Sequence, residues 1–362
     1  MTQEDVLVAL REVQDPDLKK DLVTLNMISD IKIEGNKLSF TVVLTTPACP
    51  LKEMIKNDCT KAIEKHFGSD IDLDILMSST VTSQRNEGPI LPGVKNIIAV
   101  ASGKGGVGKS TITSNLAIAL SRAGADVGVI DADIFGPSMP TMFNCEHEQP
   151  GITKVGEKNM IIPVQQYGVK LMSIGFLANP DDAVVWRGPM ASSALRQFLA
   201  DTLWGDLDYL LIDLPPGTSD IHLTLVQAVP VTGVVIVTTP QKVALADAQK
   251  GVSMFRQGQI NVPILGLVEN MAYFTPEELP DNKYYIFGEG GGEKLAKKND
   301  IPVLGQTPIV QSIRESGDSG YPAAMKDDAV SASFSELASN VARQVAIRNA
   351  NFDQTKKVEM TV

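Results

Sequence analysis

Hydrophobic residues in the first 85 positions follow helical and strand periods in turn. Val6, Leu10 and Val13 recur at helical spacing, whereas later stretches alternate apolar and polar side chains as half-buried strands do. Glu34-Gly35-Asn36 separates two such stretches and favours a hairpin. The expected elements are a helix, two hairpin strands, a second helix and a last strand, at 2–13, 28–33, 37–44, 51–67 and 71–77. We therefore predict a small α+β domain over residues 1–85.

From residue 96 to 349, short apolar runs alternate with helical patterns. This alternation is typical of a parallel sheet joined by crossover helices. The runs expected as strands are 97–101, 126–130, 208–213, 233–238, 264–269 and 303–305. A last helix is predicted over 331–347, because Phe334, Leu337, Val341 and Val345 share one face. The pattern predicts an α/β domain over 96–349 with a mostly parallel, doubly wound sheet.

Two stretches lie outside these periodic regions. Residues 86–95 carry two prolines and two glycines and are expected to form an interdomain linker. Residues 350–362 lack an apolar face, so we expect a disordered tail that does not anchor the chain to a membrane.

The apolar run 97–101 ends in a glycine-rich turn before a helical pattern, which is the setting of a phosphate-binding P-loop. The residues expected to surround the phosphates lie in this turn and the first helical positions: Gly103, Gly105, Gly106, Val107, Gly108, Lys109, Ser110 and Thr111. Backbone N–H groups and the helix dipole favour phosphate here. Lys109 can reach the β- and γ-phosphates of ATP, and the Ser110 hydroxyl can coordinate Mg²⁺. The alternative, a chance glycine-rich turn, does not explain the complete motif.

A second lysine, Lys104, lies inside the same turn. The resulting K-G-G-V-G-K-S sequence resembles the deviant Walker A motif of the dimeric P-loop NTPases related to MinD, ParA and the nitrogenase iron protein. This resemblance implies that Lys104 acts in catalysis by reaching across a dimer interface to the partner's nucleotide. The alternative is a solvated loop lysine.

Two later strands are expected to end in carboxylates beside the nucleotide. The strand 126–130 runs into Asp131-Ala132-Asp133, where Asp133 can orient the attacking water, although one or both carboxylates can instead cap the next turn. The strand 208–213 ends at Asp213, in the Walker B position that organises Mg²⁺, usually through water. A Pro-Pro-Gly turn follows, and the Gly217 N–H is a candidate sensor of the γ-phosphate.

Residues for the nucleotide base are expected near the last two strands. Asn270 follows the run 264–269 and is placed to hydrogen-bond the adenine edge, a role that its position has in the resembled family. Turn capping is the alternative for Asn270. Pro308 follows the last strand and is expected to line the base pocket.

The chain has three widely spaced cysteines and no C-x-x-C pair, so no disulfide framework is indicated. Cys49 lies in T-T-P-A-C-P at a loop-to-helix junction, where a helix N-terminus would favour the thiolate needed for metal ligation. The alternative is a small buried apolar residue. Cys59 is expected to pack inside a helix, and Cys145 is either buried or near a dimer interface.

Composition narrows the possible partners. A net charge of −11 argues against non-specific nucleic-acid binding, which needs a basic surface. The first residues are acidic and unlike a secretory signal, and no apolar run approaches the length that spans a bilayer. We expect a cytoplasmic protein that binds neither nucleic acid nor membrane.

Several motifs together resemble one family. KGGVGKS, DADIFGPSMP, WRGPM at 186–190, LLIDLPPGTSD and VENM are similar to the Mrp/ApbC-type iron–sulfur cluster carrier ATPases, which belong to the MinD/ParA-like group. The first 85 residues look like the MIP18-type (DUF59) domain, whose T-x-P-x-C-P cysteine matches Cys49. The resemblance implies a homodimer that binds ATP with Mg²⁺, carries a [4Fe–4S] cluster, and works with scaffold proteins and apo iron–sulfur proteins.

The chain departs from this family where the cluster ligands are expected. Family members carry a C-x-x-C pair after the E-N-M segment, but no cysteine follows Cys145 here. The departure resembles the HCF101-like plastid branch of the family. A cluster then depends on Cys49, Cys59, Cys145, other ligands or a partner's thiols, and Cys49 from both subunits is the best candidate.

Two other functions remain as alternatives. The P-loop alone would permit a MinD/ParA-type positioning ATPase that acts by nucleotide-gated dimerisation. A metal-insertion chaperone is a weaker alternative, because His66, His147 and His222 form no ligand motif. We predict an ATP-hydrolysing iron–sulfur carrier with slow turnover coupled to cargo exchange.

Overall fold

The computed structural model describes residues 1–85, 90–134, 136–177, 188–276, 278–279 and 282–358. Contacts between backbone positions divide these residues into two compact units. The first unit holds Met1–Thr82 and Ala342–Phe352, and the second holds Ser83–Val341 and the described residues from Asp353 onward. The predicted boundary at residue 85 therefore lies three residues past the observed one. The end of the predicted ATPase domain also belongs to the small unit.

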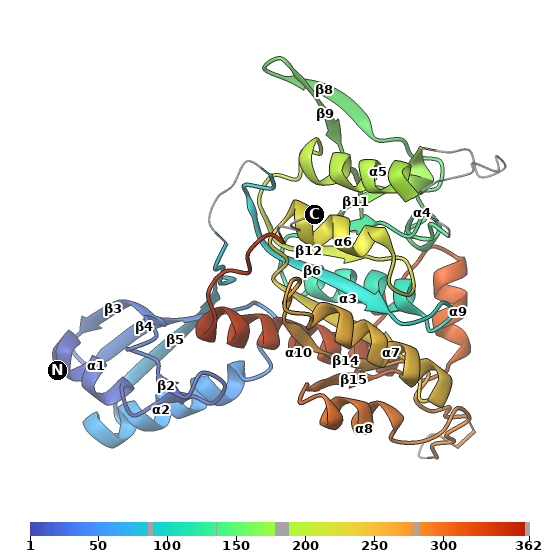
Figure 1. The fold of residues 1–362 in the computed structure, drawn as a ribbon. Helices are drawn as coiled ribbons and strands as arrows, with labels where there is room; N and C mark the ends of the chain where they lie inside the picture. The colour runs from blue at the N-terminus through green and yellow to red at the C-terminus, as the bar shows by residue number, and fades with distance from the viewer. Residues whose placement is uncertain (86–89, 135, 178–187, 277, 280–281, 359–362) are drawn as a thin grey trace. The chain divides into compact units, whose positions relative to one another are not determined.

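The small unit pairs helices with a three-stranded sheet (Figure 1). Its elements from the N-terminal part are α1 (Gln3–Leu10), β1 (Gln14–Asp15), β2 (Lys20–Asp21), β3 (Ile28–Glu34), β4 (Lys37–Leu44), α2 (Lys52–Phe67) and β5 (Asp72–Ser79). Strand β3 pairs antiparallel with β4, which confirms the predicted hairpin, and β4 pairs parallel with β5 across α2. Leu38, Phe40 and Val42 alternate along β4 and pack with Ile55 and Ile63 of α2 in one core.

The large unit is built on a mostly parallel sheet. Its strands are β6 (Val94–Ser102), β7 (Val127–Asp131), β8 (Gly151–Val155), β9 (Lys158–Ile162), β10 (Val164–Gln166), β11 (Val169–Ser173), β12 (Leu207–Asp213), β13 (Gly233–Thr238), β14 (Ile264–Glu269) and β15 (Val303–Gln306). Among the described residues, eight strands form the order β10-β11-β7-β12-β6-β13-β14-β15, in which β10 alone is antiparallel to its neighbour. Strands β8 and β9 form a separate hairpin that projects from this unit (Figure 1).

Helices cover both faces of this sheet. They are α3 (Lys109–Arg122), α4 (Met139–Met142), α5 (Gly188–Ala200), α6 (Asp220–Ala228), α7 (Lys242–Phe255), α8 (Gly291–Lys298), α9 (Gln311–Asp318) and α10 (Ala329–Asn351), with 3₁₀ turns η1 (Ile174–Phe176) and η2 (Ala323–Met325). Ile97, Ala99 and Ala101 of β6 share a core with residues of α5 to α8. Helix α3 contacts β6, β7 and β12 but contributes nothing to that core, so it packs on the opposite face. This is the predicted doubly wound α/β fold.

Strand β6 lies inside the sheet, and its carboxyl end leads into the glycine-rich turn and α3. Strands β7 and β12 end on the same side, at Asp131 and Asp213, because all three strands run parallel. Open α/β sheets bind ligands at this edge, outside the carboxyl ends of the strands. The topology therefore brings the predicted phosphate and carboxylate residues together.

The observed ends of the large unit correct two predictions. Val94 and Lys95 belong to β6 and not to a linker, and the side chains of Ser83 and Arg85 donate to the carbonyls of Lys95 and Val94. Residues 86–89 lie outside the described chain.

The tail also differs from the prediction. Helix α10 extends to Asn351, and Val358 is buried in the core of the large unit, where its N–H donates to the Val226 carbonyl at 3.0 Å. The predicted disordered tail is therefore wrong for the part that the structure describes, because Val358 packs into this core.

Candidate functional site

The turn between β6 and α3 encloses a cavity of about 220 Å³. The predicted phosphate-binding residues other than Gly103 line this cavity, together with Lys104, Asp133 and Ser138. Gly106 and Gly108 adopt φ values of 80° and 79°, in the left-handed region that glycine tolerates best. Backbone N–H groups at the N-terminus of α3 favour an anion here. The cavity thus has the form and the charge of a phosphate site.

Gly108 is also required for steric reasons. A Cβ atom at this position would lie 2.1 Å from Nδ2 of Asn270. Asn270 in turn donates through Nδ2 to the Val107 carbonyl at 2.8 Å and accepts from the Thr307 hydroxyl at 2.5 Å. Asn270, the predicted base-binding residue, therefore connects the glycine-rich turn to Thr307, the residue that follows β15. Its contact with adenine stays a prediction.

Lys109 is buried between two carboxylates. Its Nζ atom lies 2.8 Å from Asp213 Oδ2 and 3.5 Å from Asp133 Oδ2, and its side chain is only 6% exposed. Asp213 is fully buried, so removal of the lysine charge would leave a carboxylate uncompensated in a poorly solvated site. The structure thus joins three residues that the sequence placed in the site, and it holds the lysine near the phosphate cavity.

Asp213 also accepts from two hydroxyl groups of α3. Ser110 Oγ donates to Oδ2 at 2.6 Å, and Thr113 Oγ1 donates to Oδ1 at 2.7 Å. Thr113 was not predicted, because it lies beyond the P-loop motif and no sequence signal distinguishes it from other polar residues on a buried helix. The oxygens of Ser110 and Asp213 form the kind of ligand pair that Mg²⁺ prefers.

Asp131 holds the turn after β7. Its Oδ2 accepts from the N–H groups of Ser138 and Met139, at 3.0 and 3.1 Å, and from the Ser173 hydroxyl at 2.9 Å. Burial, with the nearby charge of Asp213, raises the pKa of Asp131 to about 7, while these donors act in the opposite direction. Of the two alternatives for this acidic pair, turn capping applies to Asp131, and Asp133 is the carboxylate that faces Lys109.

The Gly217 N–H was predicted to contact the γ-phosphate, but it is directed to a backbone carbonyl instead. It donates to the Ser102 carbonyl at 2.9 Å, at the carboxyl end of β6. This bond has to break before the amide can contact a phosphate, so the direct sensor role does not fit this conformation. Gly103 likewise packs closely, since a Cβ there would lie 2.0 Å from the Asp247 carbonyl carbon. Gly103 therefore allows the glycine-rich turn to pack closely against the backbone of α7.

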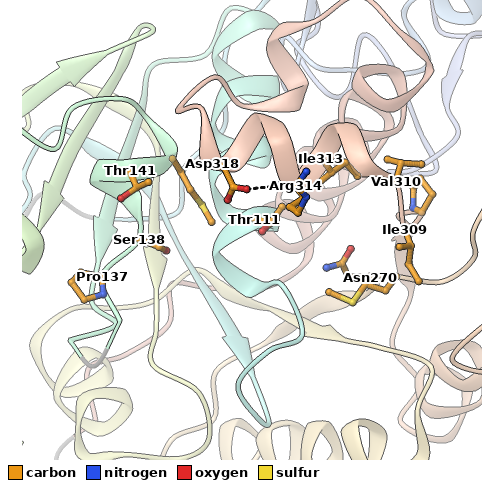
Figure 2. Close-up of a pocket in the computed structure, with 14 residues that line it drawn as sticks. Thr111, Pro137, Ser138, Thr141, Asn270, Ile309, Val310, Ile313, Arg314 and Asp318 are labelled. Atoms are coloured by element: carbon orange, nitrogen blue, oxygen red, sulfur yellow. Dashed lines mark hydrogen bonds and ion pairs between the residues drawn. The ribbon is translucent and has the colours of Figure 1, made fainter.

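A second cavity, of about 500 Å³, continues from the first (Figure 2). Thr111, Ser138 and Met142 line both cavities. The other described residues of its wall come from the loop after β7, from α4, from the segments after β14 and β15, and from α9. They are Pro137, Thr141, Asn270, Met271, Pro308, Ile309, Val310, Ile313, Arg314, Gly317 and Asp318. Pro308 and Asn270 therefore line one cavity beside the glycine-rich turn, and their contact with a nucleotide base stays a prediction. The methionines and isoleucines were not predicted, since nothing in their spacing separates them from core residues.

Cys49 lies in the small unit, three residues before α2, and is half-buried. Burial raises the pKa of its thiol, with Asp15 and Asp17 acting in the same direction, while the Leu51 N–H and the Arg343 charge oppose them. The expected thiolate is therefore not favoured in a single chain, because burial outweighs the helix N-terminus. Arg343 of α10 forms an ion pair with Asp17 within this unit.

The other two cysteines are packing residues in this structure. Cys59 is fully buried and Cys145 is 3% exposed, and burial raises the pKa of each thiol to about 12. Cys59 was predicted to pack, and Cys145 takes the buried alternative. No group of three or more His, Cys, Asp or Glu side chains is arranged to hold a metal ion within the described ranges. Trp186 and Arg187 of the WRGPM motif, and Phe135, lie outside those ranges.

Comparison with known proteins identifies two family segments. A family profile described as ParA, the NUBPL iron-transfer P-loop NTPase, matches residues 93–346. A second profile, described as an iron–sulfur cluster assembly protein, matches residues 3–70. These segments correspond to the predicted ATPase domain and the predicted small domain.

Individual relatives extend over most of the chain. The iron–sulfur cluster carrier protein of Synechocystis is 47% identical over 351 residues, which are 96% of this chain and 99% of that protein. The chloroplastic Fe–S cluster assembly factor HCF101 of Arabidopsis thaliana is 42% identical over 352 residues, 95% of this chain and 64% of that protein. A solved nucleotide-binding protein of Archaeoglobus fulgidus, in complex with ADP, is 39% identical, with a TM-score of 0.57 over 66% of this chain and 91% of its own.

Within the described part of the chain, no helix is both long and apolar enough to cross a membrane. The family matches cover both units and confirm the resemblance found in the motifs. The chain belongs to the ParA-like family of NUBPL-type iron-transfer P-loop NTPases, together with the iron–sulfur cluster carrier proteins.

Proposed function

We propose that this protein is a cytoplasmic carrier of iron–sulfur clusters that binds and hydrolyses ATP. The observation that supports it best is the buried contact of Lys109 with Asp213 at a complete P-loop. That contact lies in a chain 47% identical to a protein named as an iron–sulfur cluster carrier. The P-loop indicates the nucleotide site. The similarity to iron–sulfur cluster carrier proteins indicates that the cargo is an iron–sulfur cluster.

The nucleotide site has a place for each part of ATP. The smaller cavity would hold the phosphates against the N–H groups of the turn and the Lys109 ammonium, and the larger cavity would hold the nucleoside. Ser110 and Asp213 would hold Mg²⁺, which in such sites neutralises charge on the phosphates. Asp133, with its Oδ2 3.5 Å from Lys109 Nζ, would orient the attacking water.

ATP hydrolysis would drive a conformational change. Lys109 and Lys104 would neutralise charge on the transferring phosphoryl group, with Lys104 supplied by a second copy of the chain. Lys104 lines the phosphate cavity and is partly exposed, as a residue that reaches a partner has to be. Slow turnover is expected, because the ATPase cycle would couple to loading and release of cargo.

The iron–sulfur cluster is the cargo. A [4Fe–4S] cluster takes four cysteine thiolates, and only Cys49 of the three thiols is accessible in a single chain. The cluster would therefore be held by Cys49 from two copies and by thiols of the scaffold or recipient apo-protein. Binding of the cluster would also have to overcome the raised pKa of the thiol, since the thiolate is the ligand.

The test compares Lys109→Ala with Lys298→Ala, an exposed lysine at the end of α8. Phosphate release from Mg-ATP and transfer of a reconstituted cluster to apo-aconitase are measured on each. Lys109→Ala should lower ATP turnover by about 10²-fold or more, because it removes a charge that stabilises the transition state. Lys298→Ala should match wild type.

A milder variant guards against misfolding. Ser110→Ala keeps the Lys109–Asp213 pair and should lower turnover while urea unfolding stays near wild type. Normal ATP turnover by Lys109→Ala would contradict the proposed site. ATP-dependent sedimentation with DNA or liposomes, without cluster transfer, would instead support the positioning ATPase.

A further inference from the structure

The two cavities at the sheet edge place the nucleoside next to α9. Because Thr111, Ser138 and Met142 line both, a molecule with its phosphates in the smaller cavity extends directly into the larger one. The wall of that cavity is largely apolar, as the flat face of a purine base requires, and Ile309 and Ile313 are among its members. The remaining question is which residue recognises the base itself.

Asn270 can contact only the edge of a base, because its side chain already makes two hydrogen bonds. One amide hydrogen goes to the Val107 carbonyl, and the amide oxygen already accepts from the Thr307 hydroxyl. One N–H and one lone pair are left for the edge of a base. A contact with the face of the base has to come from another side chain.

Arg314 and Asp318 carry the full charges among the residues that line the larger cavity. They are one helical turn apart on α9. Nη2 of Arg314 lies 3.2 Å from Oε1 of Glu315, and Nη1 of Arg314 lies 2.8 Å from Oδ2 of Asp318. Figure 2 shows this pair at the cavity, between Thr141 on one side and Ile309 and Val310 on the other. Both side chains are more than 60% exposed, and exposed pairs of this kind are held weakly. Glu315 is also exposed, so the guanidinium can leave both carboxylates for a better partner at little cost.

We propose that Arg314 is the residue that recognises the nucleoside, by closing its guanidinium over the face of the base held in this cavity. The inference rests on the nucleotide-binding part of the proposed function and names the contact that the P-loop motif does not supply. A guanidinium is planar and weakly hydrated, so it stacks on aromatic rings, whereas a lysine ammonium is a compact, strongly hydrated charge. Stacking also removes one face of the base from water.

The test uses two ligands that differ in the nucleoside. ADP should occupy both cavities, and inorganic tripolyphosphate should occupy only the smaller one. Their affinities are measured by calorimetry, at one ionic strength and with Mg²⁺, for wild type, Arg314→Ala and Arg314→Lys. Arg196→Ala on α5 is the matched control, because Arg196 is exposed and lines neither cavity.

Arg314→Ala should weaken ADP binding by about tenfold and leave tripolyphosphate within about twofold of wild type. Arg314→Lys should recover only part of the loss, and Arg196→Ala should bind both ligands as wild type does. Unchanged ADP affinity in Arg314→Ala would overturn the inference alone. Equal weakening of both ligands would also overturn it, since the arginine would then act only through its charge. A wild-type protein that binds no ADP would overturn the proposed function as well.

Discussion

His222 is a buried histidine at the first turn of α6, just after the Pro-Pro-Gly turn. Its Nδ1 accepts from the Ser219 N–H at 3.1 Å, in the place where a capping box carries Glu or Gln. The ring is 1% exposed, and its Nε2 has no hydrogen-bond partner within the described structure. Burial lowers the pKa of His222 from 6.5 to about 4, so the ring stays neutral in the folded protein.

This lowered pKa predicts a pH dependence of stability. Between pH 6.5 and 4 the unfolded chain binds a proton at His222 that the folded chain does not bind, so stability falls as pH falls through this window. From pH 7 to pH 5, His222→Gln should lose about 2 kcal/mol less stability than wild type. Trp204 is buried in the large unit, so its fluorescence during urea unfolding reports this unit. An equal loss in both proteins would contradict the prediction.

The sequence motif predicted which residues surround the smaller cavity, because it fixes their spacing along the chain. Lys109, Ser110 and Asp213 meet as expected, since β6, which leads into the glycine-rich turn, and β12 are neighbours in this sheet. Thr113 and the apolar wall of the larger cavity were not predictable, because their roles arise from packing between distant segments. The Gly217 and Cys49 predictions depended on hydrogen bonding and burial, which sequence position does not reveal.

At the scale of elements, the buried parallel strands were the most predictable. The predicted runs 233–238 and 264–269 coincide with β13 and β14, because strands buried on both faces are continuous apolar runs. The hairpin of β8 and β9 was not predicted. Ile152 and Val155 are exposed on it, so its side chains lack the burial pattern that identifies a strand.

The described end of the chain provides a prediction at this scale. Val358 is buried and its N–H is bonded to Val226, so a chain that ends at Phe352 should lose about 2 kcal/mol of stability in the large unit. Val358→Ala should lose about 1 kcal/mol, and Lys357→Ala, at an exposed neighbouring position, should stay within about 0.5 kcal/mol of wild type. Tryptophan fluorescence during urea unfolding measures each. A shortened chain as stable as the full one would show that the tail contributes nothing.

At the scale of the whole molecule, the two candidate sites lie in different units. The nucleotide site belongs to the large unit, and Cys49 belongs to the small one. The small unit also includes residues 342–352, near the C-terminal end of the sequence. The sequence pattern had placed most of these residues in the ATPase domain. Residues 342–352 belong to the small unit because they contact segments that are distant in sequence, and local hydrophobic patterns do not reveal such contacts.

The carrier function depends most directly on Cys49. Removal of the thiol of Cys49 should abolish the cargo site, whereas Cys145, buried in the large unit, should not matter to it. Both cysteines can be replaced by alanine, so Cys145→Ala controls for the loss of one thiol.

Anaerobic iron–sulfur reconstitution of wild type, Cys49→Ala and Cys145→Ala shows whether Cys49 holds the cluster. A small-molecule thiol is present to supply the ligands that a partner protein would give, and iron content and absorbance are the readouts. We expect about two irons per chain in wild type and Cys145→Ala, as one four-iron cluster shared by two chains gives, and almost none in Cys49→Ala. The same iron content in Cys49→Ala as in wild type, or no bound iron in any of the three proteins, would contradict this expectation.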